Sequence, residues 1–381
     1  MIIQNGMIHD AVHKDPYKGD ILVVNGKIQM IAETILPEEG EEVYDAEGKG
    51  VYPGFVDAHS HLGLDGYGIG YEGADFNEMN NPCMPELRGI DSFNPMDMTV
   101  VFARKSGVTT VGTGPGSANV LGGTFFAVKT AGISVDEMIL RNPVAMKCAF
   151  GENPKRCYRD KGISARMTNA AILRNALFKA KEYMAKKELA GDDLSKMPAF
   201  DMKLEALIPV LKREIPLKAH AHQANDILTA IRIAKEFNVK LTLEHVTEGH
   251  LIADILAKEN YPCAVGPTFT HASKFELQNK TWKTPGILAA KGCQVSIITD
   301  APVISQQHLP LCAALAIKGG MDPFEAFKAI TINPAKHLGV ADRVGSLEPG
   351  KDADIVIFAE SLLIAGTDPE AVFIDGKRAD L

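Results

Sequence analysis

The chain lacks the marks of a secreted, membrane-spanning or nucleic-acid-binding protein. Its six cysteines include no Cys-x-x-Cys pair, which argues against a disulfide framework or a cysteine-rich zinc site and for reduced thiols in the cytoplasm. No apolar run approaches the ~20 residues that a membrane span needs, and the amino terminus lacks the basic and apolar regions of a signal peptide. The net charge of −8 and the pI of about 5.8 give no basic surface for nucleic acid or an anionic membrane. We therefore expect a cytoplasmic protein that acts on a small-molecule substrate.

What is present is an ordinary globular composition, with 46% hydrophobic and 23% charged residues among 381. This length is too great for a single small core and fits one large barrel or two to three domains. Barrels of this size often pair, so we expect a homo-oligomer.

Short apolar runs separated by turn residues occupy both ends of the chain. In residues 1–52 they are punctuated by Asn5-Gly6 and Asn25-Gly26, and Asn-Gly is the strongest short hairpin signal. Residues 343–381 repeat the pattern, with a turn at Asp375-Gly376. We therefore predict that 1–52 and 343–381 pair into one small β domain, and that 53–342 form a second domain between them.

Residues 53–342 alternate predicted strands with predicted helices. The strands are the apolar runs at 107–111, 144–150, 216–220, 240–245, 262–265 and 294–300. Helical spacing is clearest from Thr168 to Tyr183 and from Ile227 to Phe237, with Asn225 or Asp226 as the cap of the second helix. Strands separated by helices predict βα units and a parallel sheet. We expect an α/β fold of the (β/α)8 TIM-barrel type, with a doubly wound open sheet as the alternative.

Two glycine-rich segments interrupt this pattern. Residues 64–95 are longer than a normal connection and directly follow two histidines, so we expect a lid or substrate loop. The segment Gly112-Thr113-Gly114-Pro115-Gly116-Ser117, with Gly122-Gly123 behind it, lacks the Gly-Lys-Ser/Thr that closes a Walker A loop. It predicts a flexible loop at the top of the barrel.

The run from Gly54 to His61 predicts a buried strand with two histidines at its end. Residues i and i+2 of a strand face the same side, so His59 and His61 can converge on one metal ion at about 2.0–2.1 Å each. Asp57 shares this face and could orient a ligand from behind. Alone, the pattern equally fits two surface histidines.

Further polar residues stand where other predicted strands end. His220 and His222 repeat the i, i+2 spacing, His245 ends the next strand and Asp300 ends the last one. Each has a plain alternative, such as a surface histidine or an aspartate that starts a turn. The carboxyl ends of barrel strands open onto one face, where barrel enzymes have their active sites. Together these residues predict a metal site on that face.

Four segments of the chain resemble those of the amidohydrolase superfamily. They are Pro53-Gly54-Phe55-Val56-Asp57-Ala58-His59-Ser60-His61, Gly107-Val108-Thr109-Thr110-Val111, Thr331-Ile332-Asn333-Pro334-Ala335-Lys336 and residues 345–354. The similarity covers nearly the whole chain, and the nearest subgroup is the imidazolonepropionase-like and prolidase-like amidohydrolases. The resemblance implies a metal-dependent hydrolase with a distorted barrel and a small β-sandwich built from both ends of the chain.

The resemblance also implies roles for individual residues. His59 and His61 match the metal ligands of the first strand, and His220 and His245 match those of the fifth and sixth strands. Asp300 matches the aspartate of the eighth strand, which binds metal and shuttles protons.

The bridging ligand and the substrate contacts stay open. Family members have a carboxylated lysine or a glutamate at the end of the fourth strand, and Lys147 and Glu152 compete for that place. We favour Glu152 as the metal ligand, because it follows the predicted strand end whereas Lys147 lies within the strand. His222 is expected to contact substrate or to support a ligand from behind, although it could exchange roles with His220. His271 is either a further pocket residue or a plain loop histidine.

These residues predict hydrolysis of an amide, cyclic amide or dipeptide-like C–N bond in a small molecule. One or two divalent cations, with zinc expected, lower the pKa of a bound water towards ~7. Asp300 takes the proton from this water and passes it to the leaving nitrogen, and a pocket histidine such as His222 helps to stabilise the oxyanion. Arg88 or Arg156 could hold a substrate carboxylate. Deamination of a ring amidine is the alternative reaction, and a non-catalytic metal-binding scaffold is the alternative of another class.

Overall fold

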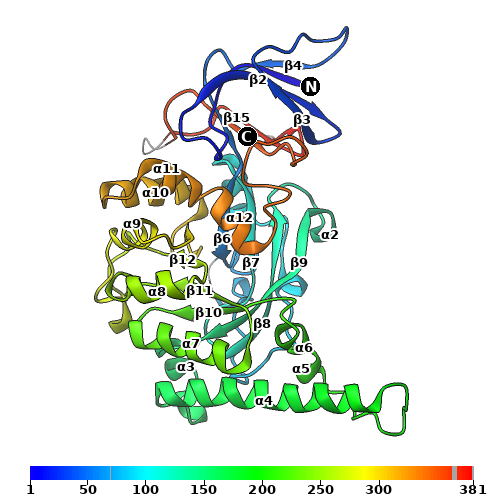
Figure 1. Ribbon diagram of the computed structural model, residues 1–381, viewed down its shortest axis with the longest axis vertical. Helices are drawn as coiled ribbons and strands as arrows, with labels where there is room; N and C mark the ends of the chain where they lie inside the picture. The colour runs from blue at the N-terminus through cyan, green and yellow to red at the C-terminus, as the bar shows by residue number, and fades with distance from the viewer. Residues whose placement is uncertain (69, 363–366, 380–381) are drawn as a thin grey trace.

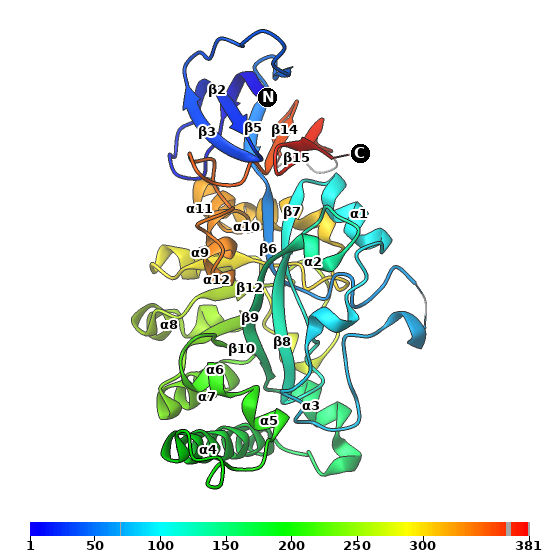
Figure 2. The same cartoon turned by 90° about the vertical axis from the view of Figure 1, so that its right-hand side faces the viewer.

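The computed structural model of the chain describes residues 1–68, 70–362 and 367–379. It contains two eight-stranded sheets in an elongated molecule. The strands from the two ends of the chain lie together at one end, and the long helix α4 (Arg166–Ala190) lies at the other (Figures 1 and 2). None of the helices within these ranges is long and apolar enough to cross a membrane.

The first sheet joins strands from both ends of the chain. Its order is β16-β15-β14-β5-β1-β2-β3, with β4 beside β1. The hairpin from β2 to β3 turns at Asn25 and Gly26, whose φ angles are both positive (51° and 76°), as a type I′ turn requires. The strands are β1 (Ile2–Ile8), β2 (Tyr17–Val24), β3 (Lys27–Ala32), β4 (Val43–Asp45), β5 (Gly50–Pro53), β14 (Ile355–Phe358), β15 (Ala371–Ile374) and β16 (Lys377–Arg378).

Side chains from both ends of the chain share one apolar core in this sheet. Ile3 and Ile21 from the first strands are buried with Ile355 and Phe373 from the last ones. The pairing of the two ends is therefore confirmed. The domain limits stay a prediction, and residues 363–366 and 380–381 of the second predicted segment lie outside the described residues.

The second sheet is the barrel. Its strands, in spatial order, are β6 (Phe55–Ser60), β7 (Val108–Thr113), β8 (Leu121–Lys129), β9 (Ile139–Ala149), β10 (Leu217–Ala221), β11 (Leu241–His245), β12 (Cys263–Val265) and β13 (Val295–Ile297). Beyond β13 the backbone closes the sheet onto β6, because Asp300 N–H donates to His59 O (3.2 Å) and His61 N–H donates to Ala301 O (2.8 Å). This closure confirms the barrel and excludes the doubly wound alternative.

One barrel strand runs against the others. β8 is antiparallel to both β7 and β9, whereas the other neighbouring strands pair in parallel. The predicted flexible loop was therefore wrong in part, because Gly122-Gly123 lie inside β8 and the residues before them form a largely buried hairpin. At Gly123 (φ 107°) a Cβ would lie 2.3 Å from Leu87 O, so close backbone packing requires glycine there.

Helices lie beside the barrel strands, except that β7 passes directly into β8 with no helix between them (Figures 1 and 2). They are α1 (Met98–Lys105), α2 (Val135–Met138), α3 (Glu152–Cys157), α4, α5 (Met202–Glu205), α6 (Ile208–Leu211), α7 (Ala224–Phe237), α8 (Ala253–Glu259), α9 (Thr284–Ala290), α10 (Leu309–Lys318), α11 (Pro323–Lys328) and α12 (Ile332–Leu338).

Helix α7 is present as predicted, but its predicted cap was wrong. Gln223 is the N-cap and provides no side-chain cap bond. The Ala224 N–H donates instead to Glu248 Oε2 (2.9 Å), and Asp226 accepts a hydrogen bond from Arg166 (2.9 Å). A first-turn N–H is thus satisfied by the side chain of Glu248, a residue distant in sequence, which a local capping rule does not consider.

Candidate metal centre

The predicted ligands meet at the carboxyl end of the barrel. His59 lies near the end of β6, with His61 just beyond it, and His245 is the last residue of β11. Around them, His220 lies on β10 with His222 one residue past its end, and Asp300 follows β13. All five histidines are buried, with 0–5% of each residue exposed.

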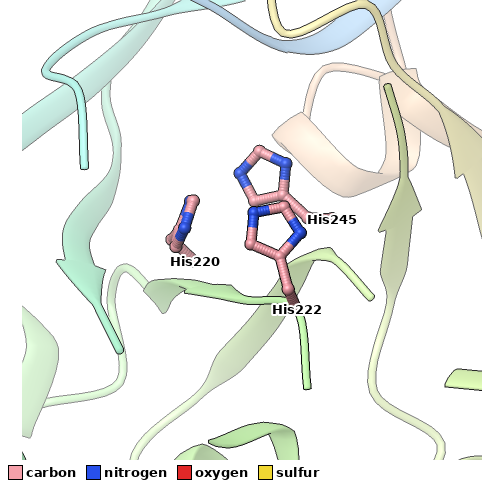
Figure 3. A group of neighbouring side chains, drawn as sticks. All are labelled: His220, His222 and His245. Carbon is pink, nitrogen blue, oxygen red and sulfur yellow. The ribbon is translucent and has the colours of Figure 1, made fainter. Parts of the chain in front are cut away.

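Among the described residues, two groups of side chains are close enough to hold a cation. In His220, His222 and His245, one ligand atom from each lies within 4.8 Å of the others, and so it does in His59, His245 and Asp300. The Nε2 atoms of His59 and His61 lie 3.6 and 3.4 Å from Asp300 Oδ1. Figure 3 shows the imidazoles of the first group gathered around one space, and His245 belongs to both groups.

The hydrogen bonds of the rings fit metal binding. Nδ1 of His59 donates to Glu244 Oε2 (2.9 Å), that of His61 to Gly114 O (2.8 Å) and that of His245 to Gly266 O (2.8 Å). A donor at Nδ1 leaves Nε2 as a lone-pair acceptor, which is the form that binds metal. Nε2 of His245 is buried without a hydrogen-bond partner among the described residues. An unpartnered ring nitrogen among other imidazoles, with the Asp300 carboxylate close by, fits the nitrogen and oxygen ligands that a divalent transition metal takes.

Burial keeps four of these histidines neutral. It lowers the pKa of His59, His220 and His222 well below the usual value and that of His245 to about 4. Burial alone would raise the pKa of Asp300, but the neighbouring His245 and His61 outweigh it and lower that pKa. The centre therefore offers neutral imidazoles and an ionised carboxylate, the protonation states that a cation needs.

The backbone is unusual at two of these residues. His245 and Asp300 have positive φ angles of 73° and 53°, a region that side-chain-bearing residues rarely adopt. Such strain gathers at sites that the surrounding fold holds in place, here at two strand ends that present ligands.

Lys147, rather than the favoured Glu152, has its side chain at the metal centre. The Lys147 side chain is fully buried, and its Nζ lies 3.0 Å from His59 Nε2. The Glu152 carboxylate instead accepts a hydrogen bond from the backbone N–H of Glu276 (3.2 Å). Because β9 ends only two residues after Lys147, the Lys147 side chain already reaches the centre from within the strand. Burial lowers the pKa of Lys147 to about 8, which brings the neutral amine within reach at physiological pH.

Glu276 is a residue near the site that the sequence did not reveal. It lies in the loop after β12, is 0% exposed, and its Oε1 lies 3.6 Å from His222 Nε2 and 3.8 Å from His220 Nε2. Lys274 pairs with the same oxygen at 2.8 Å. No strand-end pattern marks this loop, so only the folded chain brings Glu276 to the histidines.

A cavity of about 390 Å³ opens beside the centre. Its walls include His61, His222 and Asp300, and the long loop predicted as a lid contributes Phe76 and Asn77. Arg156 also lines the cavity, whereas Arg88 lines a separate one. His271 is exposed and is not among the lining residues. The volume suits a small molecule.

The chain is similar to known proteins over nearly its whole length. Residues 51–379 match the model of the amidohydrolase family. A crystal structure of an amidohydrolase from Thermotoga maritima is 41% identical, with a TM-score of 0.96 over 100% of this chain and 99% of that one. The amidohydrolase tasK of Hapsidospora irregularis is 29% identical over 386 residues, which are 94% of this chain but only 39% of that protein. An imidazolonepropionase of Symbiobacterium thermophilum is 24% identical over 385 residues, covering 89% of this chain and 81% of that one.

Proposed function

The chain belongs to the amidohydrolase family, and from that premise we propose that it hydrolyses a C–N bond of a small molecule at a centre holding one or two divalent metal ions. The observation that carries this proposal is that Nδ1 of His59, His61 and His245 is hydrogen-bonded to the surrounding fold. The Nε2 atoms of His59 and His61 lie beside the Asp300 carboxylate. A relative named imidazolonepropionase supports a small C–N substrate.

The ligands divide into two halves. His59, His61 and Asp300 would hold one cation, and His220 and His245 would hold a second. Lys147 lies beside His59, and its neutral amine can add to carbon dioxide and lose a proton, giving a carboxylate able to join the halves. A bound divalent cation would make a water nucleophilic near neutral pH and polarise the carbon that it attacks.

Asp300 is the proposed general base. Its carboxylate is ionised, lines the cavity and is partly open to it, with 15% of its side chain exposed. It can take a proton from the attacking water and return it to the leaving nitrogen. This order supplies the two proton transfers that breaking a C–N bond needs.

His222 and Arg156 are the proposed substrate contacts. Nδ1 of His222 lies 2.7 Å from Thr247 Oγ1, which fixes the ring at the cavity wall, where it can donate to an oxyanion. Arg156 is exposed on α3 at the same cavity and can bind a carboxylate bidentately. These contacts favour N-acyl amino acids and dipeptide-like substrates.

A substrate screen with metal control tests the function. N-acyl amino acids, dipeptides and cyclic ureides are incubated with the metal-free chain and with the chain reloaded with zinc or manganese, and released amine or acid is measured. We expect turnover of at least one class, lost on chelation and restored by metal. A purified chain that contains no divalent metal by elemental analysis and binds none on reloading would overturn the proposed metal centre. Metal binding without turnover of any of these classes would support the non-catalytic metal-binding scaffold instead.

A further inference from the structure

Charged side chains lie in the barrel interior just behind the metal centre, where branched apolar residues usually form the packed layers. Glu244 on β11, Lys218 on β10 and His337 on α12 make up this group, called here the Glu244 cluster. Their side chains are 0%, 1% and 1% exposed. Glu244 directly precedes His245, and Lys218 lies two residues before His220, so the cluster occupies the strands that present the ligands.

The carboxylate of Glu244 is fully engaged. Oε2 accepts from His59 Nδ1 (2.9 Å) and from Lys218 Nζ (2.8 Å). Oε1 accepts from His337 Nε2 (2.9 Å) and from Thr242 Oγ1 (2.7 Å). Four donors use the acceptor capacity of an ionised carboxylate.

The Glu244 cluster also binds the backbone of β6, the first strand of the barrel. Lys218 Nζ donates to Ala58 O (3.0 Å), the carbonyl immediately before His59. Glu244 therefore binds the His59 imidazole and Lys218 binds the backbone of β6, and these two residues form an ion pair with each other. Since β6 carries both His59 and His61, the position of this strand end decides where both Nε2 atoms lie.

We propose that Glu244 is a positioning residue of the metal centre, which fixes the tautomer and orientation of His59 and, through Lys218, the position of the β6 end. It does not touch the substrate. The inference rests on the proposed function only in requiring that the centre binds a divalent cation.

Stability alone gives no reason for such a cluster. Replacing a buried ion pair by apolar residues of similar volume is often neutral or stabilising, whereas removing one partner is strongly destabilising. A charged acceptor on a ligand's imidazole, in contrast, raises the basicity of the ligand, and its loss weakens metal binding 10–100-fold in comparable sites.

Zinc affinity measured by competition with a chelator tests the proposal. The variant Glu244→Gln keeps the side-chain volume and removes the charge. We expect its zinc affinity to fall about 10–100-fold, with a changed visible absorption spectrum of the cobalt-loaded protein. The matched control is Asp354→Asn, which alters another buried carboxylate, paired with Lys129 (2.9 Å). Its zinc affinity and cobalt spectrum should equal those of the unaltered chain.

A second variant separates positioning from mere folding. In Glu244→Gln, Lys218 is left buried without its ion-pair partner, so Glu244→Gln combined with Lys218→Met should recover melting temperature but not zinc affinity. Recovery of both together, or wild-type zinc affinity in Glu244→Gln, would overturn the positioning role and leave the proposed function intact. Failure of the unaltered chain to bind zinc or manganese would overturn the proposed function itself.

Discussion

Two of the buried charged clusters in the described part of the chain are built in opposite ways. In the Glu244 cluster one carboxylate accepts from four donors. In the second, called here the Lys129 cluster, one ammonium at the end of β8 pairs with Asp352 and Asp354 at 2.9 Å each and with Asp375. The first lies within the barrel and touches a predicted ligand. The second joins a barrel strand to the segments around β14 and β15.

The protonation of the two clusters differs accordingly. Burial would lower the pKa of Lys129, but the three aspartates outweigh it and raise that pKa. Burial lowers the pKa of Lys218 despite its pairing with Glu244. The Lys129 cluster thus has more carboxylates than cations and is open to solvent at Asp375, which is 49% exposed. The side chains of the Glu244 cluster are almost fully buried.

A buried charged cluster can therefore join two parts of the fold or position a metal ligand. Both clusters carry the desolvation cost of buried charge. At the junction, the ion pairs of the Lys129 cluster hold the two sheets together. Behind the metal centre, the Glu244 cluster orients the imidazole of a predicted metal ligand. Variants of the two clusters should therefore affect different measurements.

The largest effect is expected at Asp300, which belongs to neither cluster. Asp300→Asn should keep metal but lower kcat by roughly 10²–10⁴-fold, because the proton acceptor is lost. Steady-state kinetics on a substrate found by the screen provides the measurement, with Asp354→Asn as the control that leaves kcat unchanged. Equal turnover in Asp300→Asn would refute the base assignment.

Lys129→Met should give the largest loss of stability. It leaves buried aspartates without their common cation, and breaking a buried ion pair costs about 3–5 kcal/mol. Urea unfolding measures this loss, and zinc affinity should stay that of the unaltered chain. A parallel fall in zinc affinity would mean that the two clusters are not separable.

The same variant has a defined pH dependence. Burial raises the pKa of Asp352, but its donors, Lys129 first, outweigh burial and lower it below the usual 3.8. A carboxyl with a lowered pKa contributes stability that is present above its unfolded value and is lost as pH falls through the folded one. Without Lys129 the pKa values of Asp352 and Asp354 both rise. The difference in free energy of unfolding between the variant and the unaltered chain should therefore become smaller in acid. Urea midpoints at pH 7 and near pH 3.5 should show the deficit shrinking; a constant deficit would contradict this.

Zinc should raise the free energy of unfolding by about 2.7 kcal/mol at a free concentration 100 times its Kd. Lys129→Met should gain the same amount as the unaltered chain, because its centre is intact. Glu244→Gln should gain less at the same free zinc concentration. Melting temperatures with and without chelator give the comparison, and an equal gain in all three proteins would blur the distinction between the clusters.

The smallest effect is expected at the rim of the Lys129 cluster. Lys27 is 52% exposed and pairs with the same Asp352 at 2.7 Å. Lys27→Ala should cost at most about 1 kcal/mol, since water screens exposed pairs. Urea unfolding beside Lys129→Met then compares an exposed and a buried cation on one carboxylate; equal losses would show that burial does not set the difference.

The fold was predictable wherever burial leaves a repeating pattern. The runs ending at His220 and His245 are short, apolar and bounded by helical spacing, so their strands were correctly predicted. β8 was missed although residues 125–128 are apolar, because glycines precede them and a βα alternation leaves no place for a hairpin. Local sequence does not state which strand a run will pair with.

The site was predictable where ligands stand at strand ends. His59, His61 and Asp300 follow apolar runs, and barrel topology brings such ends together. Glu276 could not be found, because its approach to His222 depends on the path of a loop. Lys218 and Glu244 carried a usable signal, namely charged residues inside strands that are otherwise apolar, since such charges are buried only with partners.

The seam that closes the barrel runs through the centre itself. The amide of Asp300 is bonded to His59 and that of His61 to Ala301, so the two edges cannot part without carrying ligands away from one another. Hydrogen–deuterium exchange at these two amides therefore reports on the integrity of the binding site. If these two amides exchange as slowly as the most protected amides of the barrel, the metal centre opens only when the whole barrel unfolds.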